Sequence, residues 1–275
     1  MFLNSVIEAS QKAIIKESGD YEKNGLLYCG KCNTPKEVEV EMFGRKVKQL
    51  CMCKCMEQAY NAEQDRIADI KRNEEIARNR SRGILDIDMM KCTFESDDKA
   101  NVKISGIARR YVEHFQKMKA NGKGLLFFGD TGVGKSFIAA CIANALINKG
   151  YKCLVTNFPR IINELSGLYE GKQEYINDLN RYELLVIDDL AIERDTEYTA
   201  EIVQNVVDSR YRAGLPLIIT TNLKISDLLQ PHDIRKKRLY SRLKEMCLMI
   251  EVSGEDRREK QFYENYAEYK NLLGL

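Results

Sequence analysis

The hydrophobic positions along the chain form two different patterns. From about residue 85 onward, short continuous apolar runs alternate with longer helix-forming segments. Because continuous apolar runs of this length suit strands buried on both faces, the pattern predicts an α/β domain with a parallel sheet flanked by helices. The runs are GLLFF at 124–128, CLVT at 153–156, LLVI at 184–187, LIIT at 217–220 and CLMIEV at 247–252.

The pattern before residue 85 is more polar. Residues 38–50, VEVEMFGRKVKQL, alternate apolar and polar positions around Phe43-Gly44, which predicts a short β-hairpin. Residues 56–82 contain no Pro or Gly and are rich in helix formers, which predicts a helical connector. We therefore expect three parts: a cysteine-rich module at 1–56, a helical linker at 57–84 and the α/β domain at 85–275.

Composition adds limits on location and partners. The net charge is only +2, so any nucleic-acid contact must come from local basic patches. No apolar run approaches the roughly 20 residues that cross a bilayer. The N-terminal segment lacks the apolar core and cleavage site of a signal peptide, so a cytoplasmic location is expected.

Five of the nine cysteines lie close together, on either side of the predicted hairpin. A reducing compartment and an odd count both disfavour a disulfide framework. Two cysteine pairs that bracket a hairpin predict a zinc ribbon, in which four thiolates bind one structural Zn²⁺. The preferred ligands are Cys29, Cys32, Cys53 and Cys55, with a pair of Cys51 and Cys55 as the next choice. Free thiols or a redox pair are the alternative interpretations.

A phosphate-binding loop follows the first apolar run. Residues 129–136, GDTGVGKS, match G-x-x-x-x-G-K-S between a predicted strand and a predicted helix. Lys135 is expected to contact the β- and γ-phosphates, and Ser136 is expected to bind Mg²⁺. The predicted nucleotide-binding residues of this segment are Gly129, Asp130, Thr131, Gly132, Val133, Gly134, Lys135, Ser136 and Phe137.

Polar residues follow two of the later apolar runs, those at 184–187 and 217–220. Asp188 and Asp189 follow LLVI, and ligands of open α/β sheets bind at that edge. We expect Asp188 to hold Mg²⁺ and Asp189 to polarise the attacking water, although such a pair also occurs as a helix N-cap. Asn222, after LIITT, is expected to hydrogen-bond the attacking water or the γ-phosphate. Because a guanine-specific N/T-K-x-D segment is absent, ATP is the expected nucleotide.

A basic helical segment, KKRLYSRL at 236–243, supplies a candidate arginine finger. Arg242 is the preferred residue and Arg238 the second, with a solvated cationic face as the plain alternative. A small-molecule kinase is a competing function for a phosphate-binding loop, but this segment and the TTN at 220–222 disfavour it.

Taken together, GDTGVGKS, LLVIDDL, TTN and RLYSRLKE resemble AAA+ ATPases, more narrowly the DnaC/DnaI-type helicase loaders and their IstB-like relatives. The resemblance covers roughly residues 85–260. It implies self-association, binding of a replicative helicase through the N-terminal module, contact with single-stranded DNA, and a second sensor at Arg258 or Arg257. An IstB-type transposition helper is the alternative function.

Two details qualify what the resemblance implies. Many AAA+ proteins carry Glu where Asp189 stands, so slow or partner-stimulated hydrolysis is expected. For DNA contact, the candidate segments are 158–160 and 169–172, where aromatic and basic residues mix. Ordinary helix core and surface is the alternative explanation for both segments.

Overall fold

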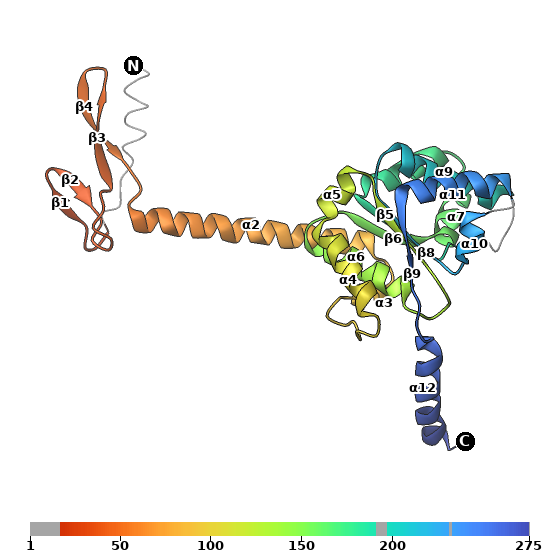
Figure 1. The fold of residues 1–275 in the computed structure, drawn as a ribbon. Coiled ribbons are helices and arrows are strands. Elements are labelled where there is room, and N and C mark those ends of the chain that lie inside the picture. Colours follow the sequence, from red (N-terminus) through yellow and green to blue (C-terminus); the bar gives the residue numbers. More distant parts are fainter. Residues whose placement is uncertain (1–16, 191–196, 231–232, 275) are drawn as a thin grey trace. The chain divides into compact units, whose positions relative to one another are not determined.

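The computed structural model describes residues 17–190, 197–230 and 233–274. The chain divides into two compact units, Met1–Asn73 and Glu74–Leu275 (Figure 1). This boundary falls inside the predicted linker, whereas the division into three functional parts stays a prediction. The N-terminal segment from which a signal peptide was excluded lies mostly outside the described residues.

The first unit contains two antiparallel hairpins. Strands β1 (Tyr21–Lys23) and β2 (Leu26–Tyr28) form one, and β3 (Glu37–Met42) and β4 (Arg45–Leu50) form the other, which is the predicted hairpin. Both turns place two residues at positive φ, Asn24-Gly25 and Phe43-Gly44, as two-residue hairpin turns of this type require.

This unit has little apolar core of its own. Leu27, Cys29 and Cys53 are its buried apolar residues among those described, whereas Phe43 at the hairpin tip is 88% exposed. Helix α2 (Lys54–Gly83) begins directly after Cys53 and runs through the predicted connector into the second unit. A unit with so few buried side chains needs another source of stability.

The second unit is an α/β domain. Its sheet is wholly parallel, with the strand order β6-β7-β8-β5-β9, which confirms the predicted fold class. The strands are β5 (Gly124–Phe128), β6 (Cys153–Asn157), β7 (Leu184–Asp188), β8 (Leu217–Thr221) and β9 (Cys247–Glu251). The helices are α3 (Ile87–Lys91), α4 (Val102–Glu113), α5 (Phe115–Ala120), α6 (Lys135–Asn148), α7 (Phe158–Ser166), α8 (Lys172–Asp178), η1 (Leu179–Arg181), α9 (Glu197–Arg212), α10 (Ile225–Leu229), α11 (Ile234–Met246) and α12 (Arg257–Leu273).

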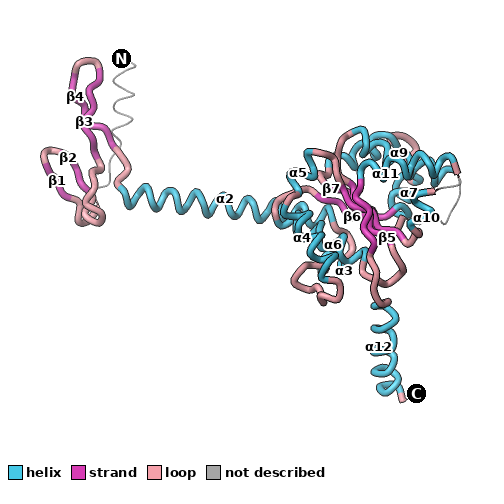
Figure 2. Tube along the Cα trace, viewed as in Figure 1, coloured by secondary structure: helices cyan, strands magenta, loops and turns pink. Residues whose placement is uncertain are grey.

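Helices cover both faces of this sheet (Figure 2). In β5, Leu125 and Phe127 pack with α4 and α6, whereas Leu126 and Phe128 pack in the cluster that contains α7, α9 and α11. Burial on both faces explains why the strands are continuous apolar runs rather than alternating ones. No described helix is long and apolar enough to cross a membrane.

A fully buried arginine, Arg210, holds together the segments that lead into β7 and β8, at the amino ends of these strands. The Arg210 guanidinium on α9 donates to the carbonyls of Tyr182 (2.7 Å), Pro216 (2.8 Å), Leu179 (3.3 Å) and Glu183 (3.4 Å). Burial lowers the pKa of Arg210 to about 10. The side chain therefore satisfies loop carbonyls that have no strand partner.

Candidate nucleotide site and metal centre

The phosphate-binding loop connects β5 to α6. Gly132 and Gly134 have φ of 78° and 97°, a region that side-chain-bearing residues rarely adopt. A Cβ on Gly132 would collide with the Asp256 carboxylate, and one on Gly134 would lie 3.0 Å from an Arg257 guanidinium nitrogen. The loop therefore needs glycine for both its curvature and its contacts.

Lys135 lies at the base of this loop and is 7% exposed. Its Nζ donates to the carbonyls of Gly129 (2.9 Å) and Asp130 (2.6 Å). Burial lowers the pKa of the ammonium group, while Asp189, Asp130 and Asp188 act in the opposite direction. The lysine is thus held where its charge can meet phosphate oxygens.

A pocket of about 290 Å³ opens over the loop. It brings together Lys135, Ser136, Asp188, Asp189 and Asn222, which come from three segments of the chain. The remaining lining residues are Thr131, Gly132, Gly134, Phe137, Thr220, Arg257 and Arg258. Thr220 is a pocket residue that the sequence reasoning missed. Both arginines considered as a second sensor lie here.

The two carboxylates lie at the end of β7, with Asp188 as its last residue and Asp189 in the sharp turn that follows. Asp189 has φ of 55°, which is uncommon for a residue with a side chain. The Asn222 amide lies 3.4 Å from the Asp189 carboxylate, and the Thr220 hydroxyl lies 2.6 Å from the Asp188 carboxylate. Strand β8 lies between β7 and β5, so its end faces both the acids and the loop, as expected for Asn222.

Helix α12 begins at the pocket. The Arg257 amide donates to the Gly132 carbonyl at 3.2 Å, and the Arg257 guanidinium pairs with Asp98 at 3.0 Å. The Asp256 carboxylate accepts from the amides of Arg258 (2.9 Å) and Glu259 (3.3 Å), so it caps the helix. The first turn of α12 therefore rests on the phosphate-binding loop.

The two candidate finger arginines differ in their surroundings on α11. Arg242 pairs with Asp208 of α9, and its guanidinium lies 5.8 Å from the ring centre of Tyr211. Arg238 is exposed. Neither lines the pocket of its own chain. Arg242 is thus engaged within the subunit, an interaction that sequence spacing does not reveal.

Of the two candidate DNA segments, the first has its aromatic residue in the core, whereas Pro159 and Arg160 are exposed. Phe158 is 4% exposed and packs in a hydrophobic cluster, so its ring cannot stack on a base. In the second segment Tyr169 is fully exposed, and Lys172 lies 5.5 Å from the ring centre of Tyr198.

The cysteine cluster contains the four preferred residues. The sulfurs of Cys29, Cys32, Cys53 and Cys55 lie within 4.8 Å of one another. Cys55 Sγ is 3.3 Å from Cys53 Sγ and 3.5 Å from Cys29 Sγ. A tetrahedral Zn²⁺ with bonds of about 2.3 Å separates its sulfurs by about 3.8 Å, so these four residues fit the ion. Cys51 Sγ lies instead 3.4 Å from the Pro35 carbonyl.

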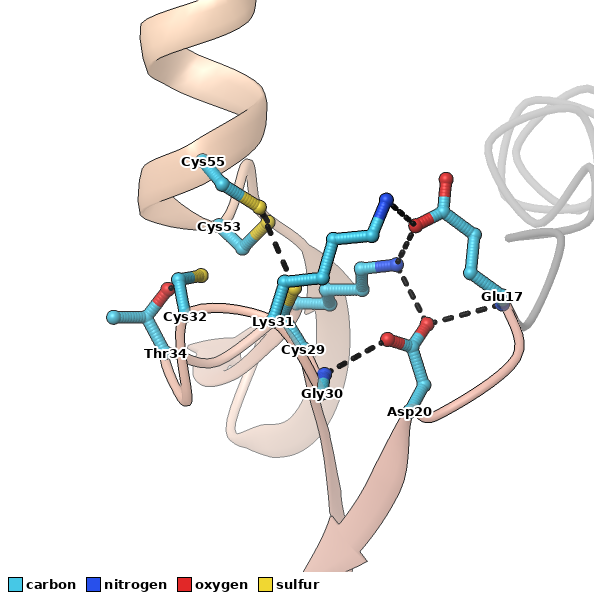
Figure 3. A network of polar contacts seen from close by, with 10 residues as sticks. Glu17, Asp20, Cys29, Gly30, Lys31, Cys32, Thr34, Cys53 and Cys55 are labelled. Carbon is cyan, nitrogen blue, oxygen red and sulfur yellow. Dashed lines mark hydrogen bonds and ion pairs between the residues drawn. The ribbon is translucent and has the colours of Figure 1, made fainter.

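Polar neighbours support this cluster (Figure 3). The Asp20 carboxylate accepts from the Gly30 amide at 3.1 Å and from the buried Lys36 ammonium at 2.6 Å. Thr34 Oγ1 accepts from the Lys54 amide at 2.9 Å and lies 3.0 Å from Cys32 Sγ. Because Thr34 already accepts from Lys54, its hydroxyl hydrogen is available to the Cys32 sulfur.

Neighbouring groups shift the pKa values of Cys29, Cys32 and Cys55 in different directions. The Thr34 hydrogen bond lowers the pKa of Cys32 to about 5. The neighbouring Cys53 sulfur raises the pKa of Cys55 to about 12. Crowded sulfurs therefore oppose full ionisation of the cluster unless a metal ion neutralises it. All nine cysteines are free of disulfides.

A family model described as IstB-like ATP binding protein matches residues 45–265. The replicative helicase loader DnaI of Bacillus subtilis is 25% identical over 185 residues, which cover 62% of this chain and 60% of that protein. The replicative helicase loader DnaC of Escherichia coli is 27% identical over 144 residues, which cover 50% and 58%. The chain thus spans about 60% of the length of these relatives.

Two solved structures share the fold. A crystal structure of DnaI superposes with a TM-score of 0.53 at 20% identity and covers 62% of this chain and 96% of that one. A crystal structure of the DnaC helicase loader gives 0.53 at 22% identity, covering 61% and 100%. At this identity the likeness concerns the fold.

Proposed function

Since the chain belongs to the family of IstB-like ATP-binding proteins, we propose that it is an ATPase that loads a replicative DNA helicase. The observation that carries the proposal is the pocket, which joins Lys135 and Ser136 to Asp188, Asp189 and Asn222. Two relatives are named replicative helicase loaders, and this supports helicase loading as the role of the ATPase.

The pocket residues divide the work of ATP hydrolysis. The loop amides and Lys135 bind the phosphates, and Ser136 and Asp188 would hold Mg²⁺, which neutralises phosphate charge. Asp189 and Asn222 orient a water whose oxygen bonds to the γ-phosphorus. The bond from that phosphorus to the bridging oxygen breaks, and its electron pair leaves with ADP. Asp189 takes one water proton and returns it to solvent.

Arg257 and Arg258 line the same pocket and extend the set of positive groups around the phosphates. An aspartate at position 189 is one methylene shorter than glutamate, so basal turnover is expected to be slow. Contact with the partner or with DNA is expected to raise it. Adenine is the proposed base because no guanine-reading segment is present in the sequence.

The cysteine module is proposed as the grip on the helicase. Four thiolates would fill the tetrahedral coordination sphere of Zn²⁺. The metal would then support the fold and leave no coordination position for a substrate. Cys53→Ser should prevent docking of the helicase while leaving ATP binding intact. Docking by a chain that has lost its zinc would argue against this assignment.

Self-association and DNA binding complete the proposal. Mixing a Lys135→Ala chain with an Arg238→Ala or an Arg242→Ala chain tests for a finger supplied by a neighbour. Activity restored by only one of the two mixtures identifies the finger. Exposed Tyr169 and Lys172 are the candidates for contact with single-stranded DNA.

The decisive experiment measures mass by light scattering after size exclusion, with the replicative helicase of the same cell. A joint complex that depends on the nucleotide supports the loader. No complex with ATP, ADP or without nucleotide favours the transposition helper, for which DNA binding is then the assay. That second function has one observation in its favour, since the family model that matches residues 45–265 is described as an IstB-like ATP binding protein.

A further inference from the structure

Strands β7 and β8 lose their regular pairing just where the catalytic carboxylates begin. The register runs from Leu185 opposite Leu217 to Ile187 opposite Ile219. Beyond this point, side chains and single backbone bonds from β8 replace the ladder. The segment they must hold is Asp188-Asp189-Leu190, with Asp189 at positive φ.

Thr220 holds both sides of this turn with one hydroxyl. Its Oγ1 accepts from the Asp189 amide at 2.8 Å and lies 2.6 Å from Asp188 Oδ1. Because an ionised carboxylate can only accept, the hydroxyl donates its hydrogen to Asp188. Its rotation is therefore fixed by two partners. Thr220 is 1% exposed, which keeps bulk water from replacing either bond.

The neighbouring residues of β8 hold the rest of the turn. The Leu190 amide donates to the Thr220 carbonyl at 2.7 Å, and the Thr221 hydroxyl donates to the Leu190 carbonyl at 2.9 Å. These bonds fix the backbone after Asp189. The Thr220 hydroxyl, however, touches both the backbone amide of Asp189 and the carboxylate of Asp188.

We propose that Thr220 is a positioning residue for ATP hydrolysis, because its hydroxyl aims the Asp188 carboxylate at the metal and holds Asp189 in its left-handed conformation. This inference rests on the proposed nucleotide function of the pocket. Partners that orient metal ligands typically change metal affinity or activity by about 10- to 100-fold when removed. In this role Thr220 acts through Asp188 and Asp189 and not on the nucleotide itself.

The test compares Thr220→Ala with Thr220→Ser in the full chain. Both lose the methyl group and differ only in the hydroxyl, so the pair separates the hydrogen bonds from packing. Thr220→Val adds a variant of nearly unchanged shape. Thr156→Val is the matched control, because Thr156 is a buried threonine near the end of β6, on the other side of β7, and lies outside the pocket.

Two quantities are measured. The first is kcat and KM for ATP with excess Mg²⁺. The second is the factor by which Mg²⁺ tightens ATP binding at equilibrium, from titrations with Mg²⁺ and with EDTA. In Thr220→Ala and Thr220→Val, kcat should fall at least tenfold, and Mg²⁺ should no longer tighten ATP binding to the same extent. KM, and the affinity for ATP measured in EDTA, should stay within about threefold of the wild type. Thr220→Ser and Thr156→Val should stay near the wild type.

An unchanged Mg²⁺ factor in Thr220→Ala would overturn the inference, as would an equal loss in the Ser and Ala variants. The binding measurement keeps this decision separate from the proposed enzymatic function. If the wild-type chain binds ATP with Mg²⁺ yet never hydrolyses it, the ATPase proposal fails. The Mg²⁺ factor still decides whether Thr220 aims Asp188.

Discussion

The cysteine module and the nucleotide domain reach stability by opposite means. The domain buries two large apolar clusters on the faces of a five-stranded sheet, and its site residues sit at the end of that rigid frame. The part of the module that the structure describes, from residue 17 onward, has two hairpins, very few buried apolar side chains and four converging sulfurs. One region is held by its core, and the other is expected to depend on an ion.

Removal of zinc should produce the largest difference in stability between the two regions. A chelator or Cys53→Ser is expected to abolish the amide-exchange protection of residues 20–53, because small metal-stabilised units unfold without their ion. The domain should keep its protection and its melting transition. Hydrogen exchange analysed by segment measures both. Cys51→Ser is the matched control, since Cys51 lies outside the group of four. Equal sensitivity of both cysteine variants would refute the assigned ligands.

Replacement of Arg210 should destabilise the nucleotide domain and leave the cysteine module unchanged. Arg210→Met keeps much of the side-chain length but leaves carbonyls of the buried loops without donors. A loss of about 3 kcal/mol or more in unfolding free energy of the domain is expected, at roughly 1–3 kcal/mol per buried unsatisfied group. Chemical denaturation followed for each region measures it, with exposed Arg212→Met as control. Zinc content should stay unchanged, and its loss would show that the regions are not independent.

Removal of the loop lysine should affect binding more than stability. Lys135→Ala is expected to weaken ATP binding by about 100-fold, since hydrogen bonds to charged groups contribute roughly 1.5–3 kcal/mol. Titration with a fluorescent ATP analogue measures the change, and exposed Lys152→Ala should bind normally. Removing the buried lysine also removes a desolvated charge, so the melting temperature should not fall. Undiminished affinity would contradict the proposed phosphate site.

The smallest effect is expected at Asp256. Asp256→Asn retains a capping side chain for α12 but removes a negative charge beside the loop. ATP affinity should rise by about two- to fivefold, since a charge at a partly exposed helix end contributes roughly 0.3–1 kcal/mol. The same titration measures it, and Glu255→Gln should change it less. A fall in affinity would mean that Asp256 assists the nucleotide instead.

Much of the nucleotide domain was predictable because its signals are local. Continuous apolar runs give the five strands, and the loop motif has a fixed length between strand and helix. The predicted positions of Lys135, Asp188 and Asn222 follow from parallel strands ending at one edge. The resemblance carried the same information to the family level, and the IstB-like match bears it out.

What escaped the sequence depends on contacts between distant segments. Thr220 looks like an ordinary β-branched strand residue until Asp188 and Asp189 lie beside it. The contact between Arg242 and Asp208 likewise requires α9 and α11 to pack together. The β1–β2 hairpin is a different matter. Asn24-Gly25 is a strong local turn signal and could have been recognised from the sequence.

The first turn of α12 adds one consequence for the nucleotide domain. The Asp256 carboxylate that caps this helix presses on Gly132, within the loop that would receive a triphosphate. The Asp256 carboxylate and a bound triphosphate would thus share one small region, in a pocket that Arg257 and Arg258 line. Binding linkage is reciprocal: if ATP loosens the cap, whatever tightens the cap must expel ATP by the same factor. Capping of α12 and binding of the nucleotide would then oppose each other in a single equilibrium.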